Sequence, residues 1–168
     1  MPEWVSIAVY VMLLALVGWG MWRGWQRRVR SSALAVPAIP GVPDDLGATL
    51  LGPLEATYVS STTAGDWLDR VAAHDLGNRS AAQVEVHDAG VLLRRRGATD
   101  VFVPARRLRA VGTAPGMAGK FVGGQGLVVL TWETGADRVL DTGLLVRHRA
   151  ERPALVAAVR GLIAGAAA

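Results

Sequence analysis

The sequence predicts an α+β protein, in which one N-terminal transmembrane helix precedes a small β-barrel or bent sheet with a C-terminal helix. The helix is predicted by residues 4–22 (WVSIAVYVMLLALVGWGMW), which carry no charge. Short alternating apolar segments, separated by Gly and Asp turns, follow residue 50 and are typical of strands. Pro153 begins a last segment in which apolar residues recur at helical spacing.

The uncharged segment has the properties of a membrane span. As a helix of about 19 residues it covers roughly 28 Å, which matches the hydrocarbon core of a bilayer. Tryptophans stand at both of its ends, where indole rings favour the membrane interface. A secretory signal peptide fits less well, because Glu3 precedes the apolar run and basic residues follow it. A buried core helix is also disfavoured, since the segment is apolar on every side.

Basic residues determine the predicted orientation. Arg23, Arg27, Arg28 and Arg30 form a juxtamembrane segment behind the span, and positive residues stay on the cytoplasmic side. We therefore expect a single-pass protein of the plasma membrane, with its N-terminus outside and its C-terminal domain in the cytoplasm. Anionic lipid headgroups are expected to attract the same arginines.

The chain divides into an anchor over residues 1–30, a Pro-rich linker over residues 31–50 and a domain over residues 51–168. Prolines among small residues predict that the linker is extended. Within the domain, Trp67 and Trp132 are expected in the core, and residues 112–126 are expected to form a long glycine-rich loop. The expected elements are strands near residues 54–61, 83–87, 91–93, 100–103, 127–132 and 138–140, a helix over residues 67–76 that Thr63 and Asp66 would cap, and the C-terminal helix.

Several segments of the chain resemble one family. They are TTAGDWLDRVAAH (62–74), DVFVPARRLRAVGTAPGMAGK (100–120), and GLVVLTW with LDTG (within 126–143). These segments resemble the membrane-anchored pleckstrin-homology-like (PH-like) proteins of actinobacteria, a family of unknown function. The resemblance implies a PH-like barrel that a C-terminal helix covers, and it implies no reaction.

Basic and apolar side chains provide the candidate contacts with lipid or with a partner. Two arginine clusters lie on predicted neighbouring strands, and in PH domains basic residues bind phosphates. The alternatives are a solvated strand edge for the arginines and a plain connection for the loop. The expected contact residues are Arg94, Arg95, Arg96, Arg106, Arg107, Arg109, Met117, Lys120 and Phe121.

No catalytic, metal or cofactor site is predicted. The chain has no cysteine, and His74, His87 and His148 lack metal-ligand spacing. Residues 116–120 end in Gly-Lys but lack the first glycine and the final hydroxyl residue of a phosphate loop. Residues 141–143 match the Asp-Thr-Gly triplet of aspartic proteases, but a turn at a strand end is favoured. Nucleic acid is not expected as a partner, because basic and acidic residues nearly balance in the domain.

These observations favour a membrane-tethered, non-enzymatic PH-like module that binds a protein partner at the inner face of the plasma membrane and needs no cofactor. Tethering raises the local concentration of such a module, so weak contacts suffice. The alternative is an accessory subunit of a membrane complex such as a transporter.

Overall fold

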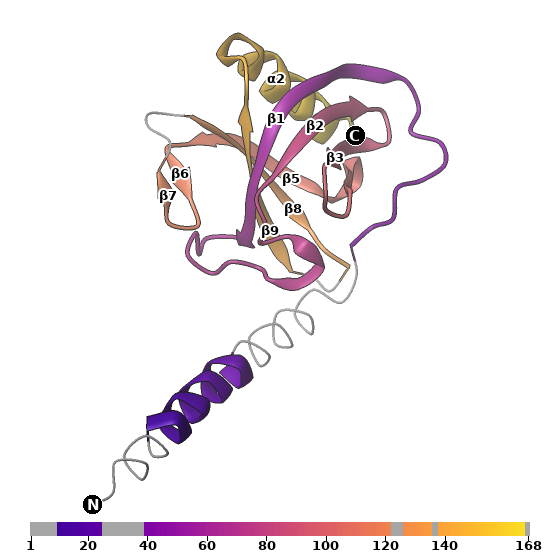
Figure 1. Ribbon diagram of the computed structural model, residues 1–168. Coiled ribbons are helices and arrows are strands. Elements are labelled where there is room, and N and C mark those ends of the chain that lie inside the picture. The colour runs from indigo at the N-terminus through magenta and orange to yellow at the C-terminus, as the bar shows by residue number, and fades with distance from the viewer. Residues whose placement is uncertain (1–9, 25–38, 122–125, 136–137, 167–168) are drawn as a thin grey trace, which may run out of the picture.

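The computed structural model describes residues 10–24, 39–121, 126–135 and 138–166, without the side chains of Lys120 and Phe121. A helix over residues 10–24 precedes the domain (Figure 1). The elements of the domain are β1 (Thr49–Thr63), η1 (Ala73–Asp75), β2 (Ser80–His87), β3 (Gly90–Arg95), β4 (Val101–Pro104), η2 (Ala105–Arg107), β5 (Leu108–Ala114), β6 (Gly116–Met117), β7 (Lys120–Phe121), β8 (Leu127–Glu133), β9 (Val139–Val146), η3 (Arg149–Glu151) and α2 (Arg152–Ala166).

One strongly bent sheet in the order β4-β3-β2-β1-β9-β8-β5 makes the barrel (Figure 1). Every pairing in it is antiparallel, and β1 lies in its middle, bonded to β2 along its first part and to β9 along its second. The edge strands β4 and β5 do not pair with each other. Helix α2 contacts β5 and η2 and buries Leu155 and Val159 against the core at this opening. The predicted bent sheet with a C-terminal helix is therefore confirmed.

A short polar chain crosses the otherwise apolar interior of the barrel. The indole Nε1 of Trp132 donates to Thr142 Oγ1 (2.9 Å), whose hydroxyl also bonds Ser61 Oγ (2.7 Å). Ser61 in turn bonds the Tyr58 hydroxyl at 2.7 Å, and that hydroxyl donates to the carbonyl of Leu76 at 2.9 Å. Burial raises the pKa of Tyr58 to about 12, although Ser61 and a nearby arginine favour the ionised form. Every polar group in this row of hydrogen bonds is buried and has a partner, so the free-energy cost of keeping these groups in the core is small.

The glycine-rich region was predicted as one long loop, and this prediction is wrong for its first part. Strand β5 continues to Ala114, and β6 and β7 form a small hairpin. Met117 on this hairpin is only 3% exposed and packs with Val59 and Leu127 in a second apolar cluster. A side chain at Gly143 would meet the Met117 sulfur at 2.9 Å, so the glycine makes room for the hairpin on β9. Residues 122–125 of the predicted loop lie outside the described residues.

The connection from β1 to β2 was predicted as a capped helix, and the structure corrects this. Residues 64–79 form turns and the short 3-10 segment η1. Asp66 Oδ1 accepts hydrogen bonds from the amides of Leu68 (3.1 Å) and Asp69 (3.2 Å), which makes a local turn. Trp67 is 59% exposed, whereas Trp132 is fully buried, so the core prediction holds only for Trp132.

The predicted linker and anchor lie before the barrel. Ile39 packs against the main core, and the carbonyls of Leu46 and Ala48 accept hydrogen bonds from the β2–β3 turn at 3.1 Å, so the end of the linker is attached to the domain. Within the described residues, no helix combines the length and the apolar character that crossing a membrane requires. Residues 4–9 of the predicted span, and residues 25–38, lie outside this part of the chain, and the transmembrane helix is not confirmed.

Gly90, at the start of β3, and Gly97, in the β3–β4 turn, allow a test of the close contact between β3 and the end of β4. A Cβ on Gly90 (φ +153°) would come within 2.2 Å of the Val103 carbonyl oxygen, whereas a Cβ on Gly97 (φ +76°) has nothing within 4 Å. Gly90→Ala should lower the free energy of unfolding by about 3 kcal/mol or more, because the β3–β4 pairing must shift. Gly97→Ala should cost about 1–2 kcal/mol, from backbone strain alone. Urea unfolding of the full chain in mild detergent measures both, and equal losses would contradict the close approach at Gly90.

Candidate binding surfaces

The two predicted arginine clusters lie far apart in the fold. Arg94, Arg95 and Arg96 stand at the end of β3, while Arg106 and Arg107 lie in η2, directly after β4. Because Gly90 pairs with Pro104, η2 lies beside the start of β3, about five residues and roughly 17 Å from the first cluster. The arginines therefore do not form one basic surface.

Arg95 differs from its two neighbours because it points into the protein. Only 5% of it is exposed, and its guanidinium lies 4.0 Å from the centre of the Tyr58 ring. Its Nη2 donates to the carbonyls of Asp75 (2.8 Å) and Asn78 (2.9 Å), and its Nη1 to the carbonyl of Thr99 (3.3 Å). Its side chain is therefore used inside the fold, where it joins the β1–β2 connection to the β3–β4 turn. The alternation of faces along a strand, applied to Arg94–Arg96, would have indicated this.

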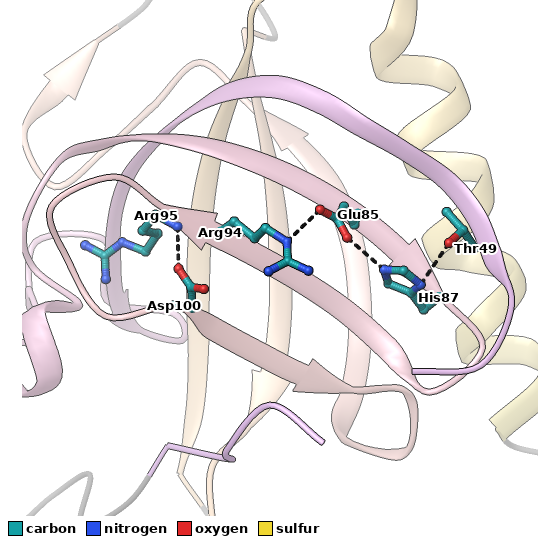
Figure 2. A network of polar contacts seen from close by, with 6 residues as sticks. All are labelled: Thr49, Glu85, His87, Arg94, Arg95 and Asp100. Atoms are coloured by element: carbon teal, nitrogen blue, oxygen red, sulfur yellow. Dashed lines mark hydrogen bonds and ion pairs between the residues drawn. The ribbon is translucent and has the colours of Figure 1, made fainter. Parts of the chain in front are cut away.

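Arg94 belongs to a polar network on the outer face of the sheet (Figure 2). Its Nε donates to Glu85 Oε1 at 2.8 Å, and the other carboxylate oxygen lies 3.0 Å from His87 Nε2. His87 Nδ1 lies 3.2 Å from the Thr49 hydroxyl. Burial raises the pKa of Glu85, but the hydrogen bonds and charges of Arg94 and His87 outweigh this and lower it overall. The network joins the start of β1 to β2 and β3, so it stabilises the sheet.

A hollow of about 440 Å³ lies beside this network and is lined in part by residues of β1, β2 and β3. It brings both signs of charge together, because Arg147 Nη1 donates to Glu55 Oε2 at 2.9 Å on its rim. Such a mixed surface suits polar contacts with a protein better than it suits a single anion. Its polar and charged lining residues are Glu55, Gln83, Arg94, Arg95, Arg96, Asp100 and Arg147.

The remaining predicted contact residues lie in different settings. Arg106 is exposed, Arg107 is half-buried, and Arg109 on β5 forms an ion pair with Glu133 on β8. Met117 is buried, so it offers no surface for a partner. Lys120 and Phe121 form β7, and their side chains lie outside the described part.

The sequence did not reveal the free edge of β5. Among the described residues, β5 pairs with β8 along one side and with no strand along the other, and α2 contacts β5. Arg109, Ala110, Gly112 and Thr113 are exposed along it. An unpaired strand edge offers amide and carbonyl groups to an added strand of a partner, so β5 is a candidate protein-binding edge.

Residues 141–143 lie inside β9, not at a strand end as predicted. Asp141 Oδ1 accepts a hydrogen bond from Thr131 Oγ1 at 2.6 Å, Thr142 belongs to the buried polar chain, and Gly143 accommodates Met117. Each residue of the triplet thus has a structural role. Among the described residues, no three His, Asp or Glu side chains are grouped so that they could hold a metal ion.

Arg95 and Arg96 form a matched pair for a stability test. Arg95→Met should lower the free energy of unfolding by about 3 kcal/mol, because the buried guanidinium is lost and three carbonyls lose their donor. Arg96→Met changes an exposed side chain and should stay within about 0.5 kcal/mol of the wild type. Thermal unfolding followed by circular dichroism compares them. Equal stability of both variants would show that the buried guanidinium is dispensable.

The lowered pKa of Glu85 leads us to expect that the stability of the fold depends on pH. Because its pKa is lower in the folded protein, its carboxylate contributes stability above about pH 4.5, and this contribution is lost as the pH falls through the folded pKa. Glu85→Gln should therefore be less stable near pH 7 and should lose less stability than the wild type between about pH 5 and pH 3. Urea midpoints across this range measure the difference. Parallel pH curves for the two proteins would contradict the assignment.

Comparison with known proteins places the chain in a family. Residues 36–160 match the bacterial PH domain-like family. Among solved structures, the C-terminal phosphotyrosine interaction domain of mouse APBB2 is similar, at 14% identity and a TM-score of 0.45, over 76% of this chain and 96% of that one. No curated protein matches the sequence. The match spans the bent sheet, the free β5 edge and most of α2, and the chain belongs to the bacterial PH domain-like family.

Proposed function

We propose that this protein is a membrane-tethered, non-enzymatic binding module. In this proposal residues 4–22 anchor the chain in the plasma membrane with the N-terminus outside, and the PH-like domain lies at the inner face and binds a protein partner. Membership of the bacterial PH domain-like family supports the role of the domain as a binding module.

The observation that carries the anchoring is the exposed apolar helix over residues 10–24. Its large apolar side chains are each 50–73% exposed, from Leu13 at the low end to Met21 at the high end. An apolar surface of this extent needs a partner or lipid to cover it. Arg23 is the first charge in the helix, and its guanidinium lies 5.3 Å from the centre of the Trp19 ring. A tryptophan beside an arginine suits the cytoplasmic interface of a membrane.

The free β5 edge supports a protein as the ligand of the domain. It carries one charged residue, Arg109, and that residue is already paired with Glu133. An extended peptide can therefore add to β5 and lie along α2 through main-chain hydrogen bonds. The module needs no reacting groups for this, which is why we propose binding without catalysis.

Anchoring and partner binding are tested together by in-cell crosslinking of the full chain and of a version without residues 1–30. The full chain should resist alkaline extraction from membranes and the shortened chain should not, because only the former holds the apolar helix. Both should capture the same soluble protein. If capture requires the helix and returns multi-span proteins, the accessory-subunit alternative replaces this proposal.

The β5 edge is tested with one lysine. Thr113→Lys places a charge on the exposed edge and should weaken capture roughly tenfold, the effect of about 1.4 kcal/mol. Ala157→Lys, on the exposed face of α2 opposite the buried Leu155 and Val159, is the matched control and should leave capture unchanged. Equal capture by both variants would exclude the β5 edge as the binding site.

A further inference from the structure

The chain reaches the domain at one particular end of the barrel. Residues 39–42 line a hollow of about 430 Å³ together with His74, Thr99 and Asp100. His74 belongs to the β1–β2 connection (64–79), and Thr99 and Asp100 belong to the β3–β4 turn (96–100). We call the end of the barrel that holds these two connections the loop end. The opposite end holds the start of β1 and the β2–β3 turn, nearer to α2 (Figure 1).

Exposed apolar side chains gather at the loop end. Among the described residues from 39 onward, four large apolar side chains are exposed: Val42 (44%), Leu50 (50%), Trp67 (59%) and Leu68 (61%). Val42 lines the hollow at the loop end, and Trp67 and Leu68 lie next to each other in the β1–β2 connection. Only Leu50, at the start of β1, lies at the other end.

Hydrogen bonds hold Trp67 and Leu68 in their exposed position. The Asp66 carboxylate accepts from the amide of Leu68, and the carbonyl of Trp67 accepts from the amide of Ala118 in the β6–β7 turn at 2.8 Å. Arg70 Nη2 donates back to the Ala118 carbonyl at 3.2 Å. Trp67 and Leu68, which we call the tip of the β1–β2 connection, are therefore held by Asp66 and by the β6–β7 turn. Their apolar side chains project from a fixed backbone.

The residues that follow the tip already occupy the barrel interior, so the side chains of Trp67 and Leu68 stay outside it. Val71, Ala73 and Leu76 fill the barrel below it and are at most 5% exposed. The carboxylate of Asp69, beside the tip, accepts a hydrogen bond from Thr63 Oγ1 at 2.8 Å. The carboxylate of Asp66 is thus bonded within the β1–β2 connection, and that of Asp69 is bonded to the end of β1.

We propose that Trp67 and Leu68 insert into the membrane interface and hold the loop end of the barrel against the bilayer. This inference rests on the proposed anchoring. Fourteen residues (25–38) separate the apolar helix from Ile39, and an extended chain of that length spans about 50 Å at most. Because the chain enters at the loop end, this end of the barrel is the nearest to the anchor along the chain. Tryptophan favours the interface, and tethering makes a contact of two side chains sufficient.

The absence of cysteine from the chain provides a direct test. Leu68→Cys carries an environment-sensitive fluorophore in the full chain, reconstituted in vesicles of phosphatidylcholine and phosphatidylglycerol. We expect blue-shifted emission and quenching by lipids that carry a nitroxide near the headgroup. Leu50→Cys, similarly exposed at the opposite end, is the matched control and should show water-like emission without quenching.

The outcomes separate this inference from the proposed anchoring. If the labelled proteins do not float with the vesicles or are extracted by alkali, the anchoring itself fails. If they are anchored but the label at position 68 behaves like the label at position 50, only the insertion is overturned. In the Leu68→Cys background, Trp67→Ser should reduce the quenching. Unchanged quenching in that variant would exclude Trp67 from the contact.

Discussion

The fold depends on a single strand that serves two parts of one sheet. β1 is 15 residues long, and it pairs with β2 from Thr49 to Tyr58 and with β9 from Ala56 to Thr63. Its pairings shift register at several points, which bends the strand and lets the sheet curve. Since β4 and β5 never meet, the curved sheet leaves an opening that α2 covers. The free β5 edge is thus a consequence of how far β1 bends the sheet.

A buried charge completes this arrangement. Arg95 has carbonyl oxygens and a tyrosine ring as its main partners, and its bonds join two connections that are far apart in sequence. A buried guanidinium is tolerated when its donors are satisfied, and five donors in a fixed plane suit several carbonyls at once. His74 and Asp75, next to these contacts, both have positive φ angles. The guanidinium holds the strained turn in place because it binds the Asp75 carbonyl.

Sequence patterns predicted the regular elements of the fold, but they did not predict the segments whose conformation or side-chain direction depends on tertiary contacts. Alternation of apolar residues predicted most strands, and Pro153 with its apolar stripe predicted α2, because burial of one face imposes these periods. The stripe over residues 67–76 was assigned to a helix, yet local hydrogen bonds of Asp66 and burial of Val71 and Leu76 produce turns instead. Side-chain direction decided the contact surfaces: Arg95 and Met117 turned inward. The β5 edge could not be predicted, because strand order is not contained in the pattern of one strand.

The segment before β1 has a mechanical consequence. Ile39 packs against the core at the loop end, and Leu46 and Ala48 are bonded to the β2–β3 turn at the other end. The segment from Ile39 to Ala48 therefore runs along the barrel from the loop end to the other end, and β1 then returns in the opposite direction. Tension applied to the chain before Ile39 acts first on these few contacts and only afterwards on the pairings of β1. We therefore expect the segment from Ile39 to Ala48 to detach before β1 separates from β2 and β9.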